Sequence, residues 1–184
     1  MTGVKKEGIG YFIAFILTIP VANWMIGNFG AVCPPKSPCL IPVGFDMMAP
    51  SGVLMIGLAL VLRDLVQRRL GKMWTVIAIV FGAALSGFVA PPTLVVASVT
   101  AFLLSELADF AVYTPLQERR LILAVFLSGL VGLVIDSVVF LQLAFGNLDY
   151  LSGQIIGKAW MILLALPIIW LIRQRDLRLG IVPA

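Results

Sequence analysis

The chain alternates between long apolar stretches and short polar segments. A transmembrane helix needs roughly 20 mainly apolar residues, and six stretches of about that length are present. They cover about residues 9–30, 47–63, 73–90, 93–113, 121–145 and 153–172. Because they occupy nearly the whole chain, they predict an all-α integral membrane protein in which a single bundle of six transmembrane helices forms one domain, residues 1–184.

The composition agrees with this pattern. Of the 184 residues, 61% are hydrophobic and 12% are charged, and the mean hydropathy is +1.08, whereas a soluble domain carries about 25% charged residues. The chain has no histidine, which removes Ser-His and Cys-His catalytic machinery. We therefore expect a protein that is not an enzyme and that holds no cofactor.

Basic residues are distributed unevenly between the segments that join the apolar stretches. With the N-terminus in the cytoplasm, the outer segments hold only Lys36. The inner segments hold eleven basic residues: Lys5, Lys6, Arg63, Arg68, Arg69, Lys72, Arg119, Arg120, Arg173, Arg175 and Arg178. The positive-inside rule then places both termini in the cytoplasm. We interpret the basic clusters as topology determinants and contacts with anionic membrane lipid, and we expect no nucleic-acid partner.

Two cysteines, Cys33 and Cys39, lie in the first outer segment, separated by three prolines, a lysine and a serine. An outer segment faces an oxidising compartment, where disulfides persist. A disulfide or two free thiols is favoured over a metal site, because two thiols without any histidine make a poor metal site. The sequence predicts no metal.

Four ionisable residues lie within the apolar stretches: Glu106, Asp109, Asp136 and Lys158. A charge at membrane depth costs about 2.5–3.5 kcal/mol on insertion scales, so such residues mark functional sites more often than not. A purely structural role, in which the charges only hold helices together, would suffice for one Asp–Lys pair. It is a weaker explanation for three acids and one base.

Depth and facing along the helices predict that these polar side chains converge on one site. At a rise of about 1.5 Å per residue, Asp136 and Lys158 lie roughly 13 Å and 8 Å below the outer ends of their helices, which makes them the best candidate ion pair. Gln154 is four residues from Lys158 and shares its helix face. We expect these side chains to contribute to a polar site in the middle of the bundle.

Two further acids lie deeper, nearer the inner ends of the helices. Glu106 and Asp109 are three residues apart and share one helix face, and Tyr113 follows one turn further on. Arg63 and Asp64 fall near the depth of Asp109, so Arg63 is a candidate partner for that carboxylate. The residue types and their spacing alone indicate that the protein binds or transports a polar substrate or an ion within the membrane.

Carboxylates and an amide suit a planar heterocycle that displays N–H donors and carbonyl acceptors. Four aromatic residues are candidates to stack on the faces of such a ring: Phe45, Phe110, Tyr113 and Trp160. The same side chains also suit a cation pathway.

At these residues the chain resembles the queuosine-precursor transporter family, also called the vitamin-uptake-like transporters. The matching motifs are Leu62-Arg63-Asp64-Leu65-Val66 with Arg69-Leu70-Gly71, Ser105-Glu106-Leu107-Ala108-Asp109-Phe110-Ala111-Val112-Tyr113, Gly132 with Asp136-Ser137 and Phe140, and Gly157-Lys158 with Leu166-Pro167. The resemblance runs from about Pro42 to Pro167. The chain departs from the family at Leu133 and Ile135, where members often carry Asn and Ser.

The resemblance implies an importer of a 7-deazaguanine-type base, such as 7-cyano-7-deazaguanine or queuine, in the cytoplasmic (inner) membrane of a prokaryote. It implies secondary or facilitated transport, with proton coupling and a homodimer as further expectations. Asp64, Glu106, Asp109, Asp136 and Lys158 fall on the polar positions of the family. Together with Gln154, Tyr113 and Arg63 they are the candidate substrate-binding residues. The alternative is the substrate-binding membrane subunit of an ATP-driven vitamin or nucleobase importer.

Overall fold

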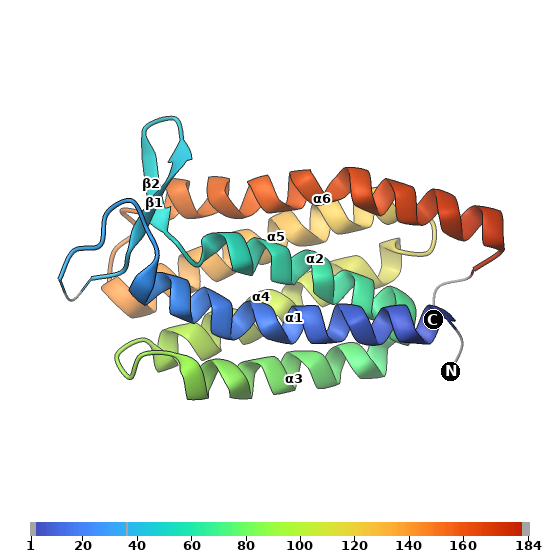
Figure 1. Ribbon diagram of the computed structural model, residues 1–184, viewed down its shortest axis with the longest axis horizontal. Coiled ribbons are helices and arrows are strands. Elements are labelled where there is room, and N and C mark those ends of the chain that lie inside the picture. The colour runs from blue at the N-terminus through green and yellow to red at the C-terminus, as the bar shows by residue number, and fades with distance from the viewer. Residues whose placement is uncertain (1–2, 36, 182–184) are drawn as a thin grey trace.

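The computed structural model describes residues 3–35 and 37–181. Six helices lie side by side in one bundle, and a two-stranded hairpin lies at one end of it (Figure 1). The helices are α1 (Gly3–Asn28), α2 (Val53–Leu70), α3 (Lys72–Val89), α4 (Val95–Leu116), α5 (Leu121–Phe145) and α6 (Leu151–Leu179), and the strands are β1 (Leu40–Gly44) and β2 (Met47–Pro50). The expected six-helix bundle is therefore present, with a small hairpin added.

Five of these helices are long and apolar enough to cross a membrane, and α2 is the exception within the described residues. Its composition follows from its position, because α2 contacts each of the other five helices. Twelve of its 18 residues are buried, including Arg63, Asp64, Arg68 and Arg69. Polar groups on α2 thus face protein rather than lipid, which is where charged residues are tolerated at membrane depth.

The predicted second span, residues 47–63, is wrong at both ends. Residues 47–50 form strand β2, and α2 begins only at Val53 and continues to Leu70. Proline at position 50 lacks a backbone N–H and restricts the residue before it to extended conformations, which favours a strand end over a helix here. The helix extends past residue 63 because the charged side chains beyond it find partners inside the bundle.

The other helices match the predicted stretches more closely. Two of them are longer than the apolar runs, because α1 starts at Gly3 and α6 continues to Leu179. The additional turns carry charged residues that lie beyond the apolar window. Helix length therefore exceeds hydrophobic length at the end of the bundle where both termini lie (Figure 1).

The hairpin between α1 and α2 was not expected from the sequence. Its strands pair antiparallel, with Leu40 opposite Pro50, and its turn holds three consecutive residues with positive φ: Gly44, Phe45 and Asp46, at 101°, 54° and 56°. Such values are uncommon for residues other than glycine. The indole Nε1 of Trp160 donates a hydrogen bond of 2.9 Å to the carbonyl of Val43, which ties the hairpin to α6.

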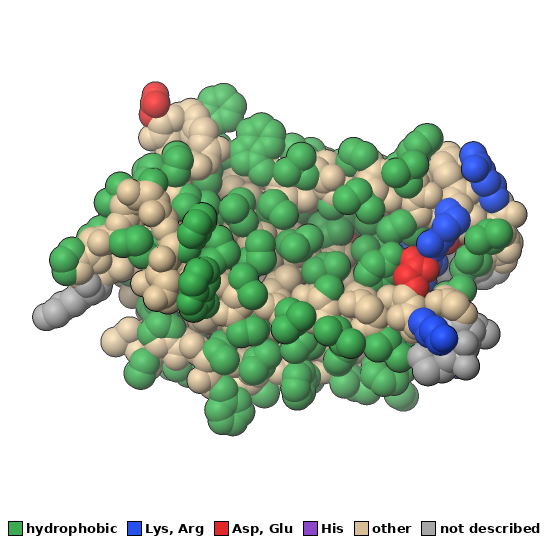
Figure 2. Space-filling view, in the orientation of Figure 1, with side chains coloured by type: hydrophobic (Ala, Val, Ile, Leu, Met, Phe, Trp, Pro, Cys, Tyr) green, Lys and Arg blue, Asp and Glu red, His purple; other side chains and the backbone are tan. Residues whose placement is uncertain are grey.

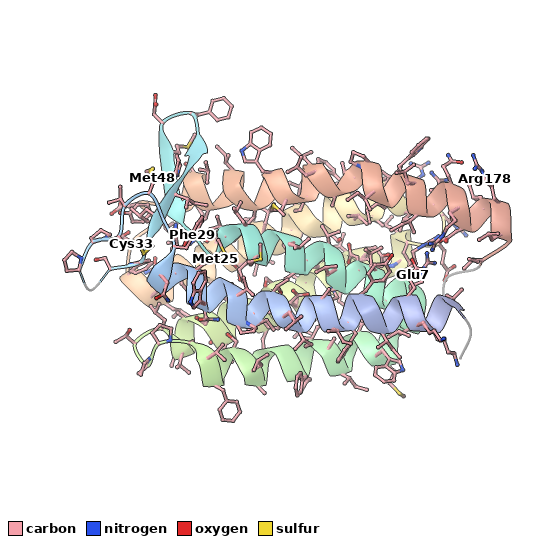
Figure 3. All side chains as sticks on the ribbon, in the orientation of Figure 1. Glu7, Met25, Phe29, Cys33, Met48 and Arg178 are labelled. Atoms are coloured by element: carbon pink, nitrogen blue, oxygen red, sulfur yellow. A yellow bond between two sulfur atoms is a disulfide. The ribbon has the colours of Figure 1, made fainter. Side chains whose placement is uncertain are left out.

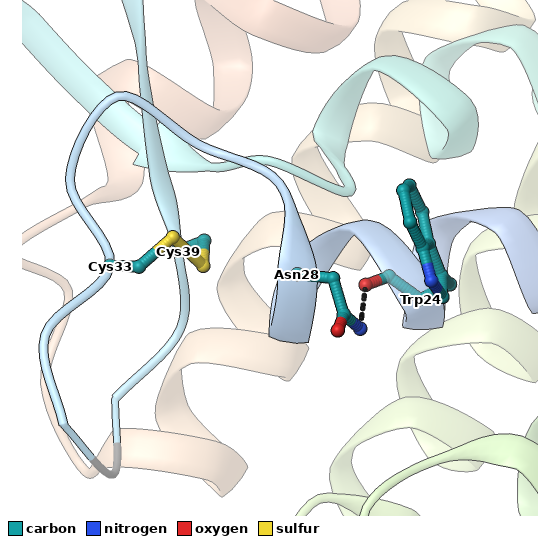
Figure 4. Close-up of a disulfide and its surroundings, with 4 residues drawn as sticks. All are labelled: Trp24, Asn28, Cys33 and Cys39. Carbon is teal, nitrogen blue, oxygen red and sulfur yellow. Dashed lines mark hydrogen bonds between the residues drawn. A yellow bond between two sulfur atoms is a disulfide. The ribbon is translucent and has the colours of Figure 1, made fainter.

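A disulfide joins Cys33 to Cys39 in the segment between α1 and β1 (Figure 4). It is one of the two alternatives expected for these cysteines. At the adjacent end of α1, the side-chain amide of Asn28 donates to the carbonyl of Trp24 at 2.9 Å. Lys36, the one basic residue expected on the outer side, lies outside the described residues.

The surface of the bundle separates into an apolar band and a charged end. Figure 2 shows hydrophobic side chains over the visible sides of the helices, while charged side chains gather at the end that holds both termini. Glu7 and Arg178 lie at that end, and Cys33 and Met48 lie at the hairpin end (Figure 3). The protein is thus a multi-pass membrane protein, and the cytoplasmic location of its termini stays a prediction from the charge distribution.

Candidate functional site

A cavity of about 50 Å³ lies among the helices in the half of the bundle nearer the hairpin. Residues from all six helices and from β2 line it: Ile19, Ala22, Asn23, Ile26, Pro50, Gly52, Val53, Ile56, Ser86, Ser98, Phe102, Asp136, Phe140, Gln154 and Lys158. Asp136 and Lys158 are its two charged lining residues. Most of the remaining lining is apolar, as is usual for small-molecule sites.

Lys158 is the centre of the polar wall of this cavity. Its Nζ donates to Asp136 Oδ2 at 2.6 Å, to Gln154 Oε1 at 2.6 Å and to Ser137 Oγ at 2.8 Å. The ammonium group is buried and uses all three of its protons, which satisfies it as a buried charge. The ion pair expected between Asp136 and Lys158 is present.

Asp136 and Gln154 keep hydrogen-bonding capacity that Lys158 does not use. Lys158 contacts Asp136 through Oδ2, and among the described residues Oδ1 accepts no hydrogen bond. Likewise, the Nε2 group of Gln154 donates to no other described residue. Since both side chains line the cavity, the site offers a free carboxylate acceptor and a free amide donor to a bound molecule.

Glycines bring α6 close to α2 at this site. A Cβ atom on Gly57 would lie 2.7 Å from the carbonyl oxygen of Lys158, and one on Gly157 would lie 2.7 Å from Cγ2 of Val53. Small residues at helix contacts let backbones approach closely in membrane proteins. The position of Lys158 therefore depends on glycine at residues 57 and 157.

A second buried cluster surrounds Arg63 of α2, on the side away from the hairpin. The guanidinium donates from Nε to Glu106 Oε2 at 3.2 Å and from Nη2 to Asp109 Oδ1, and Nη2 also lies 3.0 Å from Asp64 Oδ1. The exposed fractions of these side chains are 2% or less. Arg63 is thus the partner of Asp109, as expected, and it is shared with two further carboxylates.

The groups around this cluster are polar or aromatic. Arg63 Nη1 donates to Gln67 Oε1 at 3.3 Å, and Ser128 Oγ donates to Asp64 Oδ2 at 3.3 Å. The centroid of the Tyr113 ring lies 5.6 Å from the Arg63 guanidinium carbon, at a distance typical of a cation–π contact. The Tyr113 hydroxyl is buried and has no hydrogen-bond partner among the described residues.

The structure divides the eight predicted site residues between the two clusters. Three line the cavity: Asp136, Gln154 and Lys158. The other five, Arg63, Asp64, Glu106, Asp109 and Tyr113, form the Arg63 cluster and do not line the cavity.

The aromatic residues of the cavity differ from those expected. Its lining includes Phe102 and Phe140 but none of the four predicted stacking residues, and Phe45 is 75% exposed at the hairpin turn. The helical period contained the correct signal, because Phe140 is four residues from Asp136 and therefore lies on the same face of α5. For Phe102 the period gave no such signal, because Phe102 lies one turn from Glu106 of α4, which does not line the cavity.

A third network of charged side chains joins α1, α2 and α6 at the end of the bundle that holds the termini. Asp176 of α6 is buried and accepts two hydrogen bonds from Arg68, at 3.0 and 2.8 Å, and two from Arg69, at 2.9 and 2.8 Å. Arg69 and Arg175 also contact Glu7 of α1. The expectation that Arg68 and Arg69 contact lipid headgroups is therefore wrong, because both are buried in ion pairs that join α1, α2 and α6.

Comparison with known proteins gives one match. Residues 86–172, or 87 of the 184 residues, match a family described as "Putative vitamin uptake transporter". No curated protein and no solved structure matches the chain. The matched segment contains Phe102, Asp136, Phe140, Gln154 and Lys158 of the cavity wall. The match covers slightly less than half of the chain and agrees with the family resemblance seen in the polar motifs.

Proposed function

We propose that the protein imports a 7-deazaguanine-type precursor of queuosine across the cytoplasmic (inner) membrane of a prokaryote, by secondary or facilitated transport. One observation carries the proposal. Asp136, Gln154 and Lys158 meet at the wall of a central cavity that Phe102 and Phe140 also line. A carboxylate, an amide and aromatic rings are the groups that recognise a planar base with several N–H donors.

The chemistry of the base matches the free groups of the wall. A guanine-like edge presents a ring N–H and an exocyclic amino group side by side. A carboxylate such as that of Asp136 accepts hydrogen bonds from both groups. The adjacent carbonyl oxygen of the base needs a donor, and the Nε2 group of Gln154 supplies one. Lys158 holds both side chains in place, and Ser86 and Ser98 add hydroxyl groups on the opposite helices.

Binding requires the cavity to widen. The cavity volume is about 50 Å³, whereas drug-sized ligands occupy sites of roughly 300 Å³ or more. A base therefore enters only when helices separate near the hairpin end. Such movement of one part of the bundle against another around a central site is the usual form of alternating access.

Uptake in a reporter host tests the function. A bacterial strain that neither synthesises nor imports the precursor should regain queuosine in its tRNA when it expresses this protein and receives a low external concentration of 7-cyano-7-deazaguanine or queuine. Uptake of labelled deazaguanines should exceed uptake of ordinary purines and of vitamins. Absence of rescue despite good membrane expression would contradict the proposal.

Variants at the cavity wall test the site. Asp136→Asn, Gln154→Leu and Lys158→Met should each abolish rescue, whereas the matched surface variants Asp149→Asn and Lys72→Met should retain it, because both side chains are exposed. If all three cavity variants still restored queuosine, these residues would not form the substrate site. If uptake instead requires ATP and co-purifying ATPase subunits, the ATP-driven alternative replaces secondary transport.

A further inference from the structure

The Arg63 cluster holds more negative than positive charge. Three carboxylates, Asp64, Glu106 and Asp109, contact one guanidinium, and all four side chains are essentially without solvent contact. With every carboxyl group ionised, the cluster would carry a formal charge of −2. Uncompensated charge is strongly disfavoured in such surroundings, so buried acids bind protons instead.

Two of the carboxylates compete for the same nitrogen atom. Oδ1 of Asp64 and Oδ1 of Asp109 both contact Nη2 of Arg63. Two acids that share a partner in this way do not both ionise readily, and they titrate as a pair. The second oxygen of Asp109, Oδ2, is buried and has no hydrogen-bond partner among the described residues. The geometry thus supplies an oxygen that can hold a proton.

A metal ion fits this cluster less well than a proton does. The guanidinium already occupies the point at which the three carboxylates converge, where a cation would need to bind. Within the described residues, no group of three or more acidic or thiol side chains has an arrangement that could hold a metal ion. The nearby Tyr113 hydroxyl, buried and unpartnered there, is a further polar group available to a shared proton.

We propose that Asp64, Glu106 and Asp109 form a proton-binding site, separate from the substrate cavity, that couples proton movement to transport. The coupling role rests on the import function proposed above, whereas proton binding does not. The site lies between the cavity and the end of the bundle that holds the termini. A proton that enters from the hairpin side therefore reaches it after passing the cavity.

Other ionisable groups on the packed helices are the candidate proton donors and acceptors for this site. They include Arg68 of α2, Tyr113 of α4 and Asp136 of α5, which pairs with Lys158 of α6. The first turns of α1 carry Lys5, Lys6, Glu7 and Tyr11, and α3 carries Lys72 at its start. Asp136 is the one acid of this set that lines the cavity. Substrate binding in the cavity and proton binding at the cluster can therefore influence each other through Asp136.

Helix α5 provides a physical link between the two sites. A Cβ atom on Gly132 would lie 3.2 Å from Oδ2 of Asp109, so the backbone of α5 packs directly on that carboxyl group. Asp136 is one helical turn further along α5, at the cavity wall. A change in the protonation of Asp109 that moves α5 therefore moves Asp136 as well.

Infrared spectroscopy of the purified protein in lipid tests proton binding without any substrate. The wild-type protein should show the carbonyl stretching band of a protonated carboxyl group at neutral pH, and the band should shrink in Asp64→Asn, Glu106→Gln or Asp109→Asn. The exposed-site control Asp149→Asn should leave it unchanged. Absence of the band from the wild-type protein, or an unchanged band in all three variants, overturns the proposal.

Transport in proteoliposomes tests the coupling. An inward-directed proton gradient should drive accumulation of labelled 7-cyano-7-deazaguanine by the wild-type protein. Glu106→Gln should lose that accumulation but retain exchange of internal for external substrate, because exchange needs no net proton movement. Accumulation by Glu106→Gln equal to wild type overturns the coupling role. Absence of both exchange and accumulation in the wild-type protein contradicts the import function, while the infrared band still decides on the proton site.

Discussion

Gly57 of α2 lies directly against the backbone of Lys158 of α6: a Cβ atom at residue 57 would be 2.7 Å from the Lys158 carbonyl oxygen and 2.9 Å from its Cα. Both neighbouring atoms belong to the backbone, so they cannot move aside as the end of a flexible side chain can. The contact sets the distance between the central helix and the residue that organises the cavity wall.

Gly57→Ala should therefore impair uptake through the position of Lys158. Inserting one methyl group into a packed site costs about 1–3 kcal/mol, and a loss of about 1.4 kcal/mol at the binding site weakens affinity about tenfold. Substrate affinity and uptake of the purified variant measure the effect. Gly10→Ala in α1 is the matched control, because nothing lies within 4 Å of a Cβ there. Equal affinity in both variants would show that the close contact does not position Lys158.

The Asp136–Lys158 pair should show strong coupling in a double-mutant cycle. Removing one partner of a buried ion pair costs about 3–5 kcal/mol, because the other charge stays buried without compensation. Lys158→Met should thus lower thermal stability in detergent more than the double variant Asp136→Asn with Lys158→Met. Stability of the double variant should recover in part while uptake stays absent, since the free carboxylate is gone. Additive effects would mean that the pair contributes no coupling energy.

The network around Asp176 should stabilise the closed end of the bundle. Asp176→Asn removes the carboxylate that Arg68 and Arg69 share and leaves Arg69 with Glu7 alone, and a buried pair broken in this way costs about 3 kcal/mol. Thermal unfolding in detergent should show a clear fall in midpoint temperature. Arg178→Gln on the same helix is exposed and should leave the midpoint unchanged. A similar midpoint for both variants would argue that solvent screens the network.

The orientation of the bundle can be measured with single cysteines. In a Cys33→Ser, Cys39→Ser background, Asp149→Cys and Glu118→Cys place thiols in exposed loops at opposite ends of α5. The charge distribution predicts that a membrane-impermeant maleimide labels residue 149 in intact cells and residue 118 only after permeabilisation. Labelling in the reverse pattern would invert the predicted topology.

Several contacts of the site could be predicted from the spacing of residues along the sequence. The period of 3.6 residues placed Gln154 beside Lys158, and similar depth in neighbouring helices paired Lys158 with Asp136. Both contacts are present at 2.6 Å. The same reasoning paired Arg63 with Asp109. These predictions succeeded because a buried charge in a membrane protein needs a partner at its own depth, and few partners exist in this chain.

Other features depended on how the helices pack, which spacing does not contain. The sequence could not show that α2 lies at the centre of the bundle and therefore tolerates Arg68 and Arg69 inside the protein. Nor could it show that Phe102 lines the cavity and that Phe45 and Trp160 do not. Composition determines that a helix is apolar, but its neighbours determine which face is buried.

By itself, the sequence determined a six-helix membrane bundle, its charge asymmetry and the set of buried ionisable residues. Hydrophobic length and the cost of burying charge act locally along the chain, so they can be read without a structure. Only the tertiary structure separated that set into the cavity wall around Lys158 and the acid cluster around Arg63. That division depends on close approaches such as Gly57 to Lys158 and Gly132 to Asp109, which join residues far apart in sequence and exist only once the helices have packed.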